Sequence, residues 1–117
     1  MNELNVDSLV DVNLITEEGL EKHLTIALQK LYIANRQISH LDSQINYLRK
    51  LFRRAEKNNG YAVRYNLRMQ LSISSGVKVM YHHYAAFMEH RIASIRAKID
   101  ESSSSSPTPE ETINVRI

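Results

Sequence analysis

Apolar residues follow a heptad repeat along residues 17–57. The two rows of the repeat, which begin at Leu24 and Ala27, contain only apolar residues over five heptads. A 3-4 spacing kept up for this length is typical of a helix that packs one narrow stripe against another helix. We therefore expect a helix over 17–57, with Thr16 as its N-cap. The residues expected at the helix–helix interface of this segment are Leu20, Leu24, Ala27, Leu31, Ala34, Ile38, Leu41, Ile45, Leu48 and Phe52.

A turn is predicted at residues 58–60, because Asn and Gly tolerate the left-handed backbone that closes many helices. The next segment, 61–73, has two patterns. Apolar and polar residues alternate along it, which is typical of a half-buried strand. Apolar residues at helical spacing also run through it and continue to Ile99. On the helical interpretation, the interface residues of this second half include Met80, Tyr84, Ile92 and Ile95.

Length favours the helical interpretation. The segments 17–57 and 61–101 are equally long, so two rods of about 60 Å would lie antiparallel across a short turn. An isolated two-stranded ribbon is marginally stable. We therefore expect an all-α antiparallel helical hairpin over 16–101, with a kink or break at 72–76, where Ser and Gly weaken the helix. The alternative is a coiled-coil helix, a β-hairpin at 61–81 and a second helix.

The two ends of the chain differ in composition from the predicted hairpin. Residues 1–15 alternate weakly between aliphatic and polar residues, and we expect a flexible acidic arm there. Residues 102–117 contain a run of Ser followed by Pro and Glu, a low-complexity composition that cannot bury a core. We expect this tail to be disordered.

The formal net charge of +2 is unevenly distributed. Residues 1–21 carry six acids and no Lys or Arg, and residues 100–117 carry four acids against one Arg, which gives −6 and −3. Residues 22–99 carry 14 basic residues and three acids, which gives +11. A body this basic suits an acidic protein surface or nucleic acid, or it serves only to keep exposed helix faces soluble.

Basic residues concentrate at the predicted turn. In a hairpin they would meet at its tip, interleaved with tyrosines, and Glu56 is the one acid among them. Such a tip could bind phosphates without reading a base sequence, or it could dock on an acidic protein. The residues of this basic tip are Arg49, Lys50, Arg53, Arg54, Lys57, Arg64 and Arg68.

Candidate catalytic chemistry is missing from the sequence. No Ser-His-Asp set, acid pair or glycine-rich phosphate loop can be placed, and the absence of Cys removes thiolate chemistry and disulfides. His82, His83 and His90 lack the spacing and the carboxylate partners of a metal site. We expect no cofactor, no metal and no small-molecule substrate. With no signal peptide and no transmembrane segment in the sequence, an intracellular location, cytoplasmic or nuclear, is expected.

The heptad repeat thus carries the functional expectation. We expect a non-enzymatic coiled-coil subunit that assembles with helices of itself or of other subunits in a multiprotein complex. Small heptad-bearing subunits with acidic or Ser-rich tails are typical of many eukaryotic assemblies, and no motif here selects one family. The alternative is a nucleic-acid-binding or chromatin-binding module that acts through the basic tip.

Overall fold

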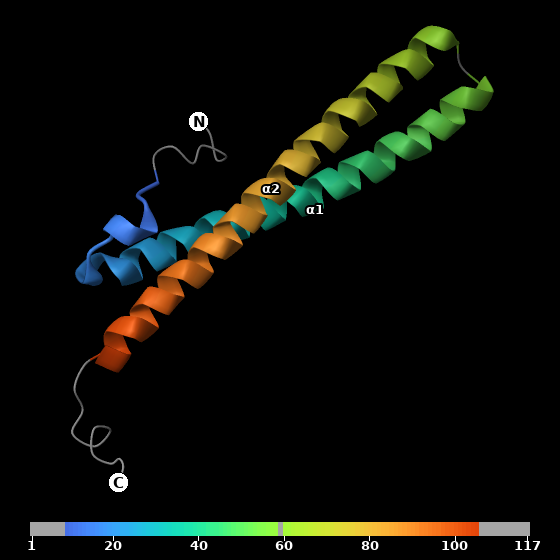
Figure 1. Ribbon diagram of the computed structural model, residues 1–117. Coiled ribbons are helices and arrows are strands. Elements are labelled where there is room, and N and C mark those ends of the chain that lie inside the picture. Colours follow the sequence, from blue (N-terminus) through green and yellow to red (C-terminus); the bar gives the residue numbers. More distant parts are fainter. Residues whose placement is uncertain (1–8, 59, 106–117) are drawn as a thin grey trace.

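The chain folds as a hairpin of two long helices (Figure 1). The computed structural model describes residues 9–58 and 60–105. Two short 3-10 turns, η1 (Val12–Leu14) and η2 (Glu17–Gly19), lead into α1 (Leu20–Asn58), and α2 (Tyr61–Ser105) returns antiparallel to it. The helical hairpin is confirmed, and since no strand occurs among the described residues, the predicted alternative of a β-hairpin at 61–81 is wrong. We call the end at the turn the tip, and the end where α1 begins the base.

The helix boundaries differ slightly from the predicted ones. Thr16 makes no side-chain capping bond and precedes the 3-10 turn η2, so α1 begins at Leu20. The second helix continues to Ser105, so residues 102–105 of the tail that we expected to be disordered are helical. Residues 106–117 of that tail, and residues 1–8 of the expected flexible arm, lie outside the described residues. The second helix also continues through residues 72–76, where a kink or break was expected. Ser74 is buried in this stretch, which indicates that packing outweighs the weak helix propensity of Ser and Gly.

Two contacts across the hairpin fix the register of the helices. Lys78 of α2 forms an ion pair with Asp42 of α1. Nearer the tip, the guanidinium carbon of Arg68 lies 5.6 Å from the centre of the Phe52 ring. The two contacts are ten residues apart on each helix, so the antiparallel pairing continues without a slip toward the tip.

On α1 the heptad rows face α2. Leu20, Ala27, Ala34, Leu41, Ile45 and Leu48 are buried, and so is Ala55, which continues the row. The other expected interface residues of this helix are half-buried, and they are Leu24, Leu31, Ile38 and Phe52.

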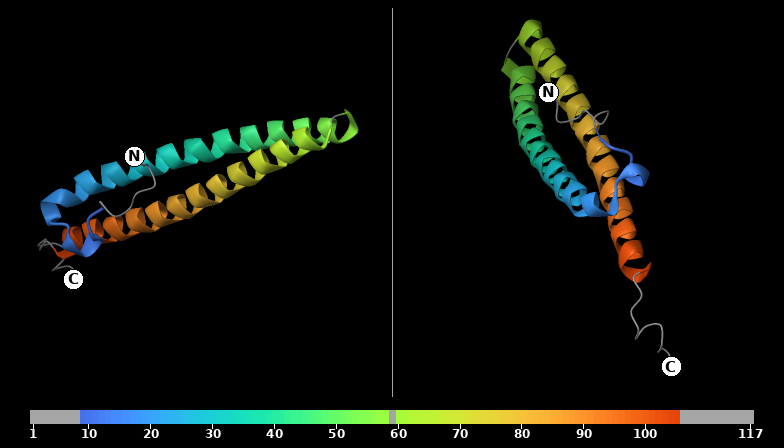
Figure 2. Two further views of the ribbon diagram at one scale, coloured as in Figure 1. Left: turned by 90° about the horizontal axis from the view of Figure 1, so that it is seen from above. Right: turned by 90° about the vertical axis from the view of Figure 1, so that its left-hand side faces the viewer.

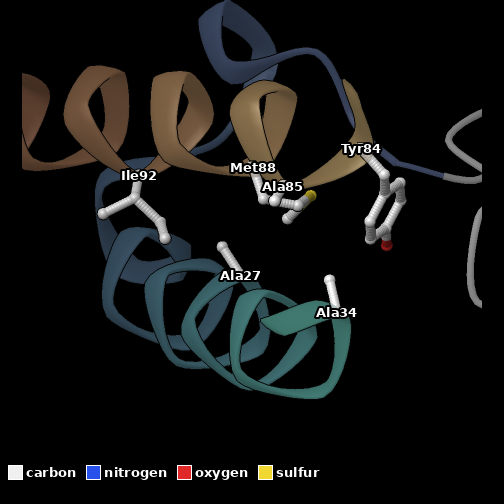
Figure 3. Close-up of a cluster of buried hydrophobic side chains, with 6 residues drawn as sticks. All are labelled: Ala27, Ala34, Tyr84, Ala85, Met88 and Ile92. Carbon is white, nitrogen blue, oxygen red and sulfur yellow. The ribbon is translucent and has the colours of Figure 1, made fainter. Parts of the chain in front are cut away.

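The main core lies in the base half of the hairpin (Figure 3). Met88 and Ala85 point from α2 toward Ala27 and Ala34 of α1, and the small alanine side chains leave room for the longer Met88. Met88 is completely buried. A second cluster joins Ile95 of α2 to Leu20 and Ile15, so the described part of the predicted arm contributes to the core. Tyr84, Ile92 and Ile95, which were expected at the interface, are buried in these two clusters.

The rows of α2 that face α1 differ from the predicted rows in the tip half. Counting back from Met88 by three and four gives Ala85, Tyr81, Lys78 and Ser74, and each of these side chains is buried or half-buried. Met80 is instead 56% exposed and does not face α1, so its prediction as a contact with α1 was wrong. The physical reason is that α2 carries two apolar stripes. The base half of α2 sets which of them turns inward.

The hairpin is elongated and has a thin core. Its extents along the principal axes are 78 × 30 × 14 Å, and its radius of gyration is 22.7 Å. A compact domain of this length would have a radius of gyration of about 13 Å. Two views at right angles show the two helices side by side, with the arm passing over α2 near the base (Figure 2). A rod of this kind leaves most helix faces open to contact from outside.

Candidate interaction surfaces

The outer face of α2 carries an apolar stripe. We call the stripe the outer stripe, and it consists of Met69, Ile73, Gly76, Met80 and Phe87. Helical periodicity places these residues on one flank of α2, about 120° around the helix axis from Ser74, Ala85 and Met88, which face α1. The four large side chains are between 43% and 61% exposed. A row of half-exposed Met, Ile and Phe side chains is typical of a surface that another protein covers.

The base half of α1 is apolar around more of its circumference than one neighbouring helix can cover. Leu28, Tyr32 and Ile33 are all at least 40% exposed. Together with Thr25 and Gln29 they line a shallow groove on the outside of α1. This second patch lies on the other helix from the outer stripe and nearer the base, so both helices carry exposed apolar surface.

The basic tip contains cations from both helices. Six of its seven basic side chains are exposed, and Arg64 is half-buried. Within residues 9–58 and 60–105, none of the seven forms an ion pair. The hairpin therefore brings together cations that are distant in the sequence, and it leaves their charge uncompensated by the described acids.

Aromatic residues accompany the positive charge of the basic tip. Tyr61 and Tyr65 stack with their ring centres 6.0 Å apart, and both rings are mostly exposed. The side-chain Nε of Arg64 is buried and has no hydrogen-bond partner in the described structure. Stacked rings beside arginines can contact bases or the side chains of a protein.

A buried arginine attaches the arm to α2. Arg91 is 6% exposed, and its Nη1 donates a hydrogen bond of 2.6 Å to the carbonyl oxygen of Val10. The arm and α2 together line a groove that includes Leu9, Asp11 and Phe87. The sequence reasoning missed Arg91, because an arginine between His90 and Ile92 resembles any surface residue. The available signal was its spacing, because Arg91 lies seven residues after Tyr84 and seven before Lys98. It therefore shares one flank of the helix with Tyr84, a predicted interface residue.

The three histidines considered as metal ligands are exposed on α2. His82 and His83 lie nearer the middle of the helix, and His90 lines the groove beside the arm. No three His, Asp or Glu side chains converge in the part of the chain that the structure describes. Over the same residues, neither helix contains a stretch that is both long enough and apolar enough to cross a bilayer.

Comparison with known proteins gives no relative from which a function could be transferred. No protein-family model matches this chain, and no curated protein or solved structure matches it either. The functional argument therefore depends on the surfaces described above.

Proposed function

We propose that this protein is a non-enzymatic helical subunit of an intracellular multiprotein complex, and that it binds helices of its partners through the outer stripe. The observation that supports this proposal is the second apolar stripe of α2. A stable two-helix rod needs only one such stripe on each helix, because each helix has one neighbour in the rod. Ile73 and Met80 remain 61% and 56% exposed in the pair of α1 and α2. Burial against a further helix gives them a role.

The thin core also supports assembly. Isolated two-helix rods bury little apolar surface for the chain entropy they lose on folding. Both buried clusters of the described core lie in the base half, and toward the tip the buried apolar side chains come from α1 alone. A partner that covers the outer stripe and the patch at Leu28 and Tyr32 would convert the rod into a bundle of three or four helices, which buries more surface per residue.

The test is affinity purification of the full chain from an extract of its source cells, followed by identification of the co-purifying proteins. The wild type is compared with the double variant Ile73→Glu, Met80→Glu, which places charges on the outer stripe without touching α1. Ser39→Glu with Ser43→Glu on exposed α1 positions is the matched control. We expect the outer-stripe variant to lose proteins that the control retains. If the wild type and the outer-stripe variant yield identical sets of proteins, the proposal is wrong.

The basic tip supports a second candidate function, namely binding of nucleic acid. The specific observation is the group of seven cations beside the exposed Tyr61 and Tyr65 rings. Replacing Arg49, Arg53, Arg54, Arg64 and Arg68 by Gln should then abolish binding to a short duplex or single strand, and wild-type affinity should fall steeply with salt. We favour docking of the basic tip on an acidic protein, because base-reading helices carry Asn, Gln or Arg along one face rather than only beside a turn. Sub-micromolar, salt-sensitive binding of a duplex would reverse this preference.

A further inference from the structure

We infer that the outer stripe binds a second copy of this chain, packed antiparallel along α2 with Gly76 on the two-fold axis. This inference rests on the proposed function. It identifies the helix that binds the outer stripe as α2 of a second copy. Four observations support a second copy over an unrelated helix: the lack of charge, the symmetry of two apolar pairs about Gly76, the free space at Gly76, and the distribution of charge along the rod.

The outer face of α2 lacks charged residues over a long stretch. Between Arg68 and Glu89 the only Lys, Arg, Asp or Glu is Lys78, which pairs with Asp42 of α1. This stretch spans about 30 Å of helix at 1.5 Å per residue. A helix face that stays in water normally carries charges in every turn or two. The lack of charge here suits a dry contact with another apolar face.

Two pairs of apolar residues on α2 are nearly symmetric about Gly76, whereas Met69 of the outer stripe would lie opposite His83. Ile73 lies three residues before it and Met80 four residues after it, while Tyr65 and Phe87 each lie eleven residues away. In an antiparallel pair centred on Gly76, Ile73 of one copy therefore meets Met80 of the other, and Tyr65 meets Phe87. An isologous contact requires this kind of self-complementarity, because each residue must suit the residue at the mirrored position. A stripe made for an unrelated helix has no such requirement.

Gly76 itself has open space around it. An added Cβ at this position would have no other heavy atom within 4 Å, apart from the local backbone and chain neighbours. Glycine in a helix interior costs up to about 1 kcal/mol relative to alanine, and no contact within this chain requires it. At the crossing point of two helices, glycine lets the backbones approach closely. The second copy thus accounts for a residue that the single chain does not explain.

Charge selects the antiparallel orientation. A parallel pair would bring the two basic tips together, so that seven cations of one copy would face seven of the other. The antiparallel pair centred on Gly76 separates the tips by about 48 Å, at 1.5 Å per residue. It also moves each tip toward Glu89 and Asp11 of the other copy, and Asp11 lines the same groove as Phe87. Like-charge contact is thereby replaced by attraction.

The area of the contact fits a reversible dimer. The four large side chains of the outer stripe each expose about 100 Å², so pairing two copies removes about 800 Å² of apolar surface from water. Interfaces are roughly 60% apolar, which implies a total of about 1,300 Å² once the polar rim is included. This value lies at the lower end of specific interfaces. We therefore expect the dimer to dissociate on dilution.

The test uses single-cysteine variants of the full chain, because the natural sequence contains no Cys. Under mild oxidation Gly76→Cys should shift to a disulfide-linked dimer, since the two-fold axis brings this position onto itself. Phe87→Cys alone should remain monomeric on a non-reducing gel, because its two copies lie about 33 Å apart in the antiparallel pair. When Phe87→Cys is combined with Tyr65→Cys, the two variants should form a disulfide-linked heterodimer. Crosslinking of Gly76→Cys and Phe87→Cys to equal extents would indicate a parallel pair and overturn the inference.

Sedimentation equilibrium supplies the independent measurement. The wild type should reach twice the monomer mass at micromolar concentration. Gly76→Leu, whose added Cβ has no heavy atom of its own chain within 4 Å beyond the local backbone and chain neighbours, should sediment as a monomer and remain helical by circular dichroism. Ser43→Leu adds the same side chain to the outside of α1 and should dimerise as the wild type does. A monomeric wild type, or an unchanged mass for Gly76→Leu, overturns the second copy. The proposed function would still stand if the purification from extract recovers proteins that depend on the outer stripe.

Discussion

Arg91 of α2 donates its Nη1 hydrogen bond to the carbonyl oxygen of Val10 over 2.6 Å, although 81 residues separate them. A hydrogen bond from a charged donor is stronger than one between neutral groups. This bond attaches the arm to the base half, next to the contact of Ile15 with Ile95. The arm is thus part of the folded structure from Leu9 onward.

Loss of the Arg91 side chain should release the arm. Removing a hydrogen bond from a charged donor costs about 1.5–3 kcal/mol, so Arg91→Ala should raise amide hydrogen exchange over residues 9–15 while exchange in α1 stays slow. Arg96→Ala, an exposed position on the same helix, is the control. Unchanged protection of residues 9–15 in Arg91→Ala would show that apolar contacts alone hold the arm.

Two methionines of α2, one buried against α1 and one largely exposed, should respond differently to truncation. Met88 is completely buried, so Met88→Ala should lower the free energy of unfolding by about 2–5 kcal/mol. Met80→Ala should change it by less than about 1 kcal/mol, because this side chain is largely exposed in the single chain. Urea unfolding followed by circular dichroism measures the free energy of unfolding of both variants. The protein concentration should be low enough that the chain is monomeric. Equal losses would contradict the assignment of the inner and outer faces.

Alanine at Gly76 should stabilise the single chain. The position is inside a helix and an added Cβ meets nothing, so we expect a gain of about 0.5–1 kcal/mol in the free energy of unfolding of the monomer. Ser43→Ala, an exposed helical position on α1, should give a smaller gain of about 0.5 kcal/mol or less. A loss of stability for Gly76→Ala at low concentration would mean that the helix is distorted at this residue.

A charge in the contact between α1 and α2 should unfold the hairpin. Leu41 is buried toward α2, so Leu41→Asp should cost several kcal/mol through the desolvation of an unpaired carboxylate. Circular dichroism should report loss of helix, and sedimentation should report an expanded chain. Gln44→Asp, an exposed position one turn away, should leave both measurements unchanged.

The sequence predicted the hairpin because α1 has one continuous heptad pattern. Each residue from Leu24 to Phe52 on the two rows is apolar, and that alone specifies which face turns inward. The equal lengths of the two helical segments then favoured helix over strand at residues 61–73. The described structure has both helices within three or four residues of the predicted boundaries.

The inner face of α2 could not be deduced in the same way. Its apolar residues form two rows, one that includes Phe87 and one that includes Met88. Both rows are apolar over several turns, so periodicity does not choose between them. Only the packing of Met88 and Ile95 against α1 shows which row turns inward in the base half, and the tip half follows it. Lys78 and Ser74 then occupy inner positions, which periodicity would not assign to them.

The attachment of the arm was also beyond the sequence. Val10 takes part through a backbone carbonyl, and a backbone group leaves no trace in the residue pattern. Arginine is usually found on the surface, so the residue type of Arg91 gives no sign of burial. Long-range contacts that use backbone atoms depend on the fold, so they emerge only when the helices are placed in space. The basic tip, by contrast, could be listed in advance because its residues lie on either side of one turn.

The uneven core of the hairpin sets the order in which it opens. Both buried clusters lie in the base half, and toward the tip Ser74 is the one buried residue of α2 among those described. Local opening is easiest where few apolar contacts hold the helices together. The two helices should therefore separate first at the tip while the base stays closed, and the free energy of opening should rise from Tyr61 toward Ile95. A partner that binds one of the two separated helices at the tip would shift the equilibrium toward the open hairpin. The base would stay folded.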